Sequence, residues 1–504
     1  MTSSRSLISD ADFGRPAVAG AAGGHRDELG AATWWWLVVA GSLGLGLLSL
    51  WLRPLLPVDE TRYLTVAWEM WERGSFLLPS LNGELYEHKP PLLFWLIHAG
   101  WAVAGVGETW PRLIGPLCTL ASAWLLSRLG ARLWPQSPQV GRLGGLLFLG
   151  SVFVAFYGTA LMFDLPLLVF VCLGWLALHD AGTHGRWRDW LGYGLAFAAA
   201  MLTKGPVAMV YLLPPLLAWR LWARLPFGSR AAWRVTVALA IAIALPLAWL
   251  LLADRQSQGE LLRRVLFEQT LGRVQGDLGH PRPLYWYLPF LPLMALPWTL
   301  WPRAWRALGG LWRQRDDRGL RLVATTVVTG FVLLSAVGGK QVHYLLPLLA
   351  LGLLALARGL HGAVAPRQLL RRAQSGLAAI ALVMVAGFAL LAPRYDLAAA
   401  GRHVGDEQRA GRETVYVGNY QGEFGYYGRL HAPVRELTPA QARDWVRTSP
   451  DGLVIARRKR LVLHGAPQPE YRQRYKTDEL LMFRAGDLVA SGSSFREPGR
   501  DSGP

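Results

Sequence analysis

Long apolar stretches recur along the 504-residue chain, with short polar or arginine-rich segments between them. A helix of about 20 apolar residues crosses a bilayer whose hydrocarbon core is roughly 30 Å thick. The pattern therefore predicts a polytopic helical membrane protein and excludes a soluble globular protein, a disordered chain and a porin-type barrel, whose strands are short and alternating. The predicted spans lie at about 34–52, 111–130, 141–158, 165–179, 189–203, 206–223, 235–252, 284–302, 321–337, 343–357 and 376–393.

One further stretch, residues 91–106, is apolar but short and opens with two prolines. Its hydropathy allows either a span or a helix lying flat at the interface. With the flat placement, about eleven spans put the arginine-rich loops on one face, which the positive-inside rule makes cytoplasmic. These loops hold Arg128, Arg132 and Arg142; Arg186 and Arg188; Arg220, Arg224, Arg230 and Arg234; the segment from Arg303 to Arg321; and Arg358, Arg367, Arg371 and Arg372.

The two ends of the chain differ from the apolar region 34–393 between them. Residues 1–33 are rich in glycine, alanine and serine, and we expect a disordered cytoplasmic tail followed by an uncleaved first span. Residues 394–488 carry the β-like runs TVYVG, GLVIA and LLMF and the helix-like stretch PAQARDWVRT, which predict a small α/β domain on the outer face. We expect a second disordered tail over 489–504.

Composition agrees with a membrane protein, because only 17% of the residues are charged and 52% are hydrophobic. Soluble proteins carry about 25% charged residues. The net charge of +18 lies mostly in short loops between spans, where it sets topology, and we expect no nucleic-acid partner. Cys118 and Cys172 both lie in apolar segments, which excludes a disulfide framework or a cysteine zinc site.

Charges so close to a membrane are costly unless they are solvated, paired or used. In the outer loop 53–110, Asp59 could cap a helix, or its carboxylate could accept a proton or order a nucleophile. Lys89, held by two prolines, suits a phosphate but could also snorkel without a function. Further candidates in this loop are Glu60, Arg62, Tyr63, Glu87 and His88.

Two isolated charges interrupt apolar sequence, Asp164 in ALMFDLPL and Lys204 in MLTKGPV. Such residues are functional candidates by default, although a partnered structural ion is the alternative. Arginines of the outer loop 253–283 suit phosphate recognition. A divalent metal held by scattered acids and histidines is left open, and no other cofactor is expected. Candidates from these later loops are Arg273, His280, Arg282, Lys340, His343 and Tyr344.

Five motifs occur in the order seen in bacterial GT-C-type, lipid-linked glycosyltransferases: DETRY, LNGELYEHKPPLLFW, ALMFDLPL, LTKGP and KQVHYLLP. The chain resembles this family over nearly its whole length, in particular the lipid A 4-amino-4-deoxy-L-arabinose transferases of the protein mannosyltransferase-like superfamily. The resemblance implies an all-α polytopic protein of about eleven to thirteen spans with a small periplasmic α/β domain. It also implies a periplasm-facing cavity and membrane-parallel helices in loop 53–110.

The resemblance also implies roles for individual residues. Asp59 would be the principal catalytic acid and Asp164 the second. Arg62, Lys89 and Arg273 would hold the donor phosphate. The cavity would be lined by Glu60, Tyr63, Glu87, His88, Lys204, His280, Arg282, Lys340, His343 and Tyr344. The chain departs from many relatives at His88, where they have an acid directly before the motif lysine.

We therefore expect a monomeric glycosyltransferase of the bacterial inner membrane, in contact with membrane lipids. It would move 4-amino-4-deoxy-L-arabinose or a related sugar from undecaprenyl phosphate to a lipid A phosphate or another cell-envelope acceptor. One alternative is transfer of another sugar to a hydroxyl of a protein or surface glycan. A transporter or flippase is a remoter alternative, because internal repeats typical of transporters are not recognisable in the sequence.

Overall fold

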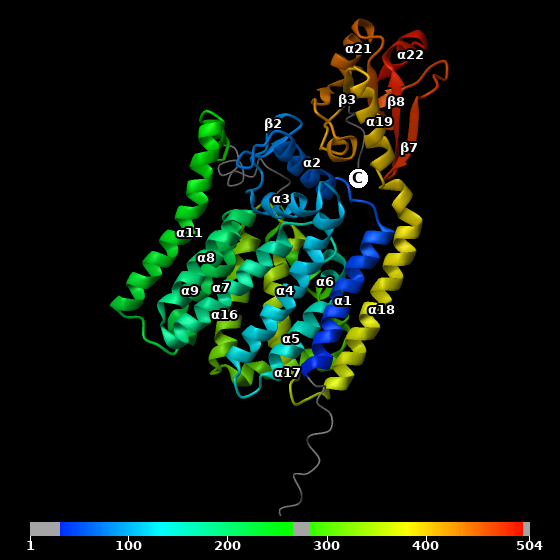
Figure 1. Cartoon of the computed structure of the whole chain (residues 1–504). Coiled ribbons are helices and arrows are strands. Elements are labelled where there is room, and N and C mark those ends of the chain that lie inside the picture. The colour runs from blue at the N-terminus through cyan, green and yellow to red at the C-terminus, as the bar shows by residue number, and fades with distance from the viewer. Residues whose placement is uncertain (1–30, 266–281, 497–504) are drawn as a thin grey trace, which may run out of the picture.

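The computed structural model describes residues 31–265 and 282–496. A bundle of helices carries a small α/β domain at one end (Figure 1). Within the described ranges, six helical stretches are long and apolar enough to cross a membrane. They are Thr109–Leu133 (α4), Asp164–His184 (α7), Ser229–Gln256 (α11), Arg318–Ala336 (α16), Val342–Leu360, which contains α17 (Leu346–Leu360), and Arg367–Arg409, which runs through α18 (Pro366–Leu391) into α19 (Ala398–Arg409).

Other predicted spans form shorter or interrupted helices. The first and fifth form α1 (Ala31–Leu52) and α8 (Trp187–Lys204). The interrupted ones contain prolines or end at small residues, and a proline removes one backbone donor and clashes with the preceding turn. Residues 141–158 form α5 (Gln139–Leu149) and α6 (Val152–Tyr157), 206–223 form α9 (Val207–Leu217) and α10 (Trp219–Trp222), and 284–302 form η2 (Leu284–Tyr287), α14 (Phe290–Met294) and η3 (Trp298–Leu300).

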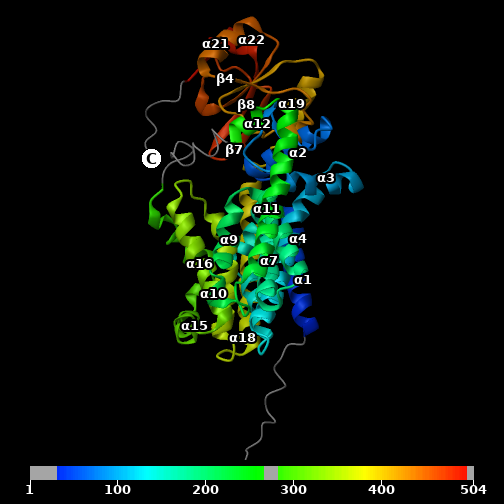
Figure 2. The ribbon, with the colours of Figure 1, turned by 90° about the vertical axis from the view of Figure 1, so that its left-hand side faces the viewer.

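The long loop after α1 folds over the end of the bundle. It contains α2 (Asp59–Glu72), a short hairpin of β1 (Ser80–Leu81) and β2 (Glu84–Leu85), and α3 (Leu92–Ala104). Figures 1 and 2 show α3 running across the bundle end and α2 lying between the bundle and the C-terminal domain. The orientation of α3 agrees with the flat placement of residues 91–106 and not with a span.

The C-terminal domain contains a five-stranded sheet in the order β4-β3-β5-β8-β7. The three β-like runs of the sequence form β3, β5 and β8, and the helix-like stretch forms α21, which begins with a capping box between Thr438 and Gln441. The strands are β3 (Thr414–Val417), β4 (Arg435–Leu437), β5 (Leu453–Arg457), β7 (Tyr471–Tyr475) and β8 (Asp478–Arg484), and the covering helices are α21 (Pro439–Thr448) and α22 (Ala485–Ala490).

Segment 418–434 of this domain binds directly to the loop that covers the bundle. Thr65 in α2 donates its hydroxyl proton to the carbonyl of Gly422 (2.8 Å). The indole of Trp68 donates to the carbonyl of Leu430 (3.1 Å). The Asn82 side chain exchanges two hydrogen bonds of 2.8 Å with the backbone of Val434. The domain is thus attached to α2 and the β1–β2 hairpin through buried and half-buried backbone contacts.

Candidate active site

A buried ion pair fixes the start of α2. The Arg53 guanidinium binds both carboxylate oxygens of Glu60, and each side chain is only 1% exposed. The amides of Leu56 and Leu161 also donate to Glu60, each at 2.7 Å, and Arg53 donates to the Thr159 carbonyl at 2.7 Å. Burial by itself would raise the pKa of Glu60, but Arg53 and these amides hold it below its usual value. Glu60 therefore joins α2 to the turn after α6.

Asp59, its immediate neighbour, has a different environment. The helix cap is Val58, which makes no side-chain cap bond, and Asp59 is already the first helical residue. Of the two alternatives left open for Asp59, the helix cap is therefore excluded. Its carboxylate is exposed and accepts a 3.4 Å hydrogen bond from the hydroxyl of Tyr63. Such a carboxylate remains accessible to a substrate.

Asp164, the first residue of α7, is 3% exposed and surrounded by ionisable side chains. Lys204, at the end of α8, forms an ion pair with Oδ1. The Tyr157 hydroxyl donates to Oδ2 at 3.0 Å, and Nε2 of His343 lies 3.8 Å from the same oxygen. Tyr344 also lies beside this group, with its ring centroid 4.4 Å from the Lys204 ammonium. Two charges isolated in the sequence are therefore partners in space.

The outer loops bring these groups together. His343 is within electrostatic range of Asp59, Lys89, Asp164 and Lys204. The Lys89 ammonium lies 5.7 Å from the ring centroid of Phe163, the residue directly before Asp164. Tyr63 packs edge-on against the same ring with a centroid distance of 4.9 Å. Two carboxylates and two ammonium groups from four separate segments thus share one site at the domain end of the bundle.

Arg62 links this site to the C-terminal domain. Its guanidinium donates to Oε1 of Gln421 at 2.7 Å and also hydrogen-bonds Tyr86. Burial raises the pKa of Tyr86 to about 12, although Arg62 acts in the opposite direction. Glu87 lies 4.0 Å from Arg264 and 3.4 Å from His88, whose side chain is half exposed. Glu87, two residues before Lys89, therefore faces the outer loop 253–283.

Lys340 and Arg282 form a separate clamp. Lys340 is 3% exposed and donates to the carbonyls of Arg282 (2.9 Å) and Val337 (2.6 Å), while Arg282 donates back to the Lys340 carbonyl at 2.9 Å. Burial and the nearby guanidinium lower the pKa of Lys340. Its ammonium is thus occupied by backbone oxygens that hold the turn before η5 (Val342–Leu345). Arg273 and His280 lie outside the described residues.

Three residues at or beside the site were not among the sequence candidates: Arg53, Tyr157 and Gln421. Tyr157 belongs to a predicted span, and Gln421 belongs to the predicted soluble domain, so neither gave a local signal. Among the described residues, one group has ligand atoms close enough together for a metal ion: His403, Glu407 and Glu470 in the C-terminal domain. Arg412 donates to both glutamates at 2.7 and 2.9 Å, so part of their charge is compensated by its guanidinium.

Comparison with known proteins gives matches in sequence and in fold. A family model described as dolichyl-phosphate-mannose-protein mannosyltransferase matches residues 88–249. The undecaprenyl phosphate-alpha-4-amino-4-deoxy-L-arabinose arabinosyl transferase 2 of Pseudomonas fluorescens (strain Pf0-1) is 30% identical over 331 residues, covering 63% of this chain and 57% of that protein. The arabinosyl transferase of Pseudomonas paraeruginosa (strain DSM 24068 / PA7) is 31% identical over 362 residues, covering 67% and 62%. The chain thus spans less than two thirds of these relatives.

The fold matches over a larger share of the chain. The crystal structure of ArnT from Cupriavidus metallidurans bound to undecaprenyl phosphate aligns with a TM-score of 0.68 at 18% identity, covering 90% of this chain and 98% of that one. The apo state of the same protein aligns with a TM-score of 0.67. The order of the motifs, the matched family model and the shared fold agree, and the chain belongs to the GT-C-type superfamily of lipid-linked membrane glycosyltransferases.

Proposed function

We propose that the chain transfers a sugar from a polyprenyl-phosphate carrier to an acceptor at the domain end of the bundle. The observation that carries this proposal is the meeting of Asp59, Lys89, Asp164 and Lys204 around His343. The names of the relatives support undecaprenyl phosphate-linked 4-amino-4-deoxy-L-arabinose as the donor. We take the acceptor to be a lipid A phosphate.

In this reaction an acceptor oxygen forms a bond to the anomeric carbon of the sugar. The bond between that carbon and the donor phosphate oxygen breaks, and undecaprenyl phosphate leaves with both electrons. Lys89 and Arg62, with Arg273, would stabilise the charge on the leaving phosphate. Fixed cationic groups aimed at developing charge are commonly the largest contribution to catalysis. Arg62 would be held for this task by Gln421.

The two acids would have different roles. Asp164 is already bound by Lys204 and Tyr157, so it would hold the cationic and aromatic side chains in position. Asp59 is exposed and would contact the acceptor. A lipid A phosphate is anionic at neutral pH and needs orientation more than deprotonation. A hydroxyl acceptor would need Asp59 as a base, a contribution of typically 10²–10⁴ in rate.

The placement in the cell follows from the loop charges. The arginine-rich end of the bundle would face the cytoplasm together with the N-terminus, by the positive-inside rule. The site and the C-terminal domain would then face the periplasm, where lipid-linked sugars are used. We propose that the chain acts there as a monomer of the bacterial inner membrane.

The test is Asp59→Asn in a strain that lacks the wild-type protein, with lipid A analysed by mass spectrometry. We expect the pentosamine-sized mass addition to disappear or to fall about 100-fold, because loss of the acceptor's orientation alone can cost that much. Glu84→Gln is the matched control, because Glu84 is an exposed acid in the same outer loop. Normal modification by Asp59→Asn protein would remove Asp59 from the mechanism. A lipid A profile that does not depend on the expressed protein would eliminate this acceptor and leave hydroxyl acceptors.

A further inference from the structure

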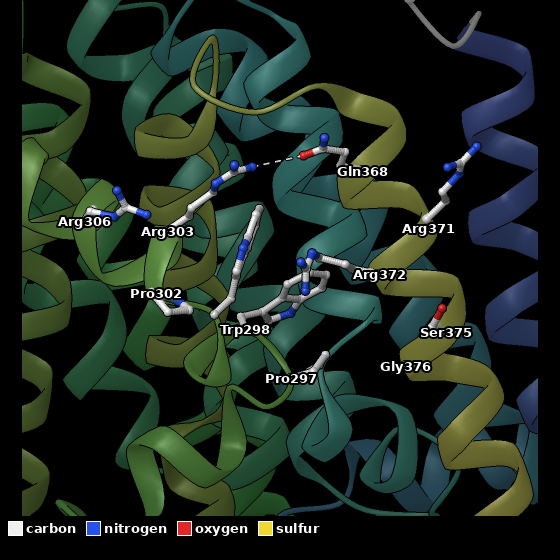
Figure 3. Close-up of a pocket in the computed structure, with 11 residues that line it drawn as sticks. Pro297, Trp298, Pro302, Arg303, Arg306, Gln368, Arg371, Arg372, Ser375 and Gly376 are labelled. Atoms are coloured by element: carbon white, nitrogen blue, oxygen red, sulfur yellow. Dashed lines mark hydrogen bonds between the residues drawn. The ribbon is translucent and has the colours of Figure 1, made fainter.

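A cavity lies at the arginine-rich end of the bundle, opposite the site around Asp164. It has a volume of about 850 Å³ and opens between η3, α15 (Pro302–Leu311) and α18 (Figure 3). This volume is within the range of known small-ligand sites, about 300–1,000 Å³. Its position at the far end of the bundle separates it from the site around Asp164. Its lining includes the cationic residues Arg303, Arg306 and Arg372 and the apolar residues Trp298, Trp301 and Gly376.

The cationic groups of the cavity lack acidic partners. Within the described ranges, no carboxylate forms an ion pair with Arg303, Arg306 or Arg372. Arg303 donates to Gln368 across the rim at 3.2 Å, and the Arg372 guanidinium carbon lies 4.6 Å from the centroid of the Trp301 ring. Figure 3 shows Arg303 and Arg372 on opposite sides of the opening. Two uncompensated guanidinium groups in this arrangement suit a phosphate between them.

The rest of the lining is apolar. Its apolar residues are Pro297, Pro302 and Gly376, together with the edges of Trp298 and Trp301, whose side chains are 1% and 7% exposed. Gly376 in α18 lines the cavity beside Pro297, where a Cβ atom would be in ordinary contact with the Pro297 ring at 3.4 Å. A free inorganic anion gains no stabilisation from such an apolar surface. An acyl chain attached to the anion is stabilised by it, because burial of apolar area contributes about 25 cal/mol per Å² to binding.

The cavity also opens toward lipid. The outward face of α18 carries Leu382 and Val383, which are 69% and 70% exposed, as expected for a helix in contact with acyl chains. On the other side, α15 lies across the bundle end (Figure 2), and Trp305 and Trp312 are 56% and 76% exposed. Exposed tryptophans at a helix end are typical of the membrane–water interface. The arginines are therefore at headgroup depth and the apolar part at acyl-chain depth.

We propose that this cavity binds an anionic glycerophospholipid of the leaflet that contacts the arginine-rich end. Its phosphate lies between Arg303 and Arg372, and one acyl chain runs over Trp298 and Gly376 along α18. Basic pockets between membrane helices are known to hold anionic lipid headgroups in this way. Positive-inside arginines alone need neither a cavity nor an apolar lining, and this site has both. The site is independent of the proposed transfer reaction.

The experiment compares lipid retention by the full-length protein and its variants in native mass spectrometry. The protein is purified with mixed phosphatidylglycerol and phosphatidylcholine, and we expect selective retention of phosphatidylglycerol. The double variant Arg303→Ala/Arg372→Ala should lose at least about tenfold in retention, since charge-assisted hydrogen bonds contribute about 1.5–3 kcal/mol each. The control Arg313→Ala/Arg318→Ala removes two arginines from the same end outside the cavity and should retain the lipid.

Two further arms keep the proposal falsifiable. Ser375→Trp fills the cavity from an exposed position of α18 without changing charge, and it should also lower retention. Phosphatidylglycerol should raise the melting temperature of the wild-type protein, and the same concentration of inorganic phosphate should leave it unchanged. Equal loss in both double variants, full retention by Ser375→Trp, or equal stabilisation by inorganic phosphate would each overturn the proposal.

Discussion

Two buried carboxylates lie at the same end of the bundle, and their surroundings differ. Glu60 accepts from one guanidinium and two backbone amides, and its partner Arg53 also binds a backbone carbonyl. Asp164 is surrounded by the side chains of Lys204, Tyr157 and His343. The first arrangement connects segments of main chain, and the second arranges groups that can move protons and charge. A buried acid near a site, such as Glu60, is therefore not part of the site because of its burial alone.

Of the substitutions that test this difference, Arg53→Met is expected to have the largest effect, a loss of stability. It leaves Glu60 buried without its cation, and breaking a buried ion pair in this way costs about 3–5 kcal/mol. Thermal unfolding in detergent should show a large fall in the melting temperature. The double variant Arg53→Met/Glu60→Leu should recover much of the loss, because an apolar replacement of both partners is often neutral. Unchanged unfolding of Arg53→Met would show that the pair has no structural role.

A smaller effect, and one on turnover, is expected from Lys204→Met. The variant removes the cation beside Asp164 and leaves Tyr157 in place, whereas Arg53→Met also removes the bonds of Arg53 to Ser49 and to the Thr159 carbonyl. The fold should therefore lose less stability than in Arg53→Met. Transfer per folded molecule should fall about 10²–10³-fold, the usual cost of removing one electrostatic group from an active site. Lys459→Met, at an exposed position of the C-terminal domain, is the control. If Lys204→Met kept normal turnover but lost much stability, the ion pair of Asp164 with Lys204 would be structural, like the pair of Glu60 with Arg53.

The smallest effect concerns pH. Because the folded pKa of Glu60 lies below its ordinary value of 4.5, its stabilisation is fully present above about pH 4.5. The stabilisation is lost as the pH falls through the folded value, by at most about 1.4 kcal/mol per pH unit for one carboxylate. The difference in melting temperature between the wild type and Glu60→Gln, followed from about pH 7 to about pH 3, should shrink with acid. A constant difference would contradict the assigned direction.

Sequence patterns predicted the helical bundle and the strands β3, β5 and β8, because long and short apolar runs are local features of the chain. The flat placement of residues 91–106 came instead from the charges of the loops, since hydropathy left it open. The isolated positions of Asp164 and Lys204 in apolar sequence made them functional candidates with a partnered ion as the alternative, and the structure pairs them with each other. The pairing of Arg62 with Gln421 joins residues 359 positions apart, and no local pattern reports such a contact. Asp59 does not cap the helix, because α2 begins one residue earlier than a cap at Asp59 requires, with Val58 at the cap position.

Segment 418–434 has a consequence for how this protein could be recombined with its relatives. Its carbonyls accept hydrogen bonds from Thr65, Trp68 and Asn82, and these donors lie in the loop that carries Arg62. Cutting the chain after α18 would therefore uncover unpaired polar groups beside the site, and a foreign C-terminal domain would have to supply the same acceptors. The natural module boundary does not follow the membrane surface. The unit that can be exchanged as a whole is the domain together with α2 and the β1–β2 hairpin.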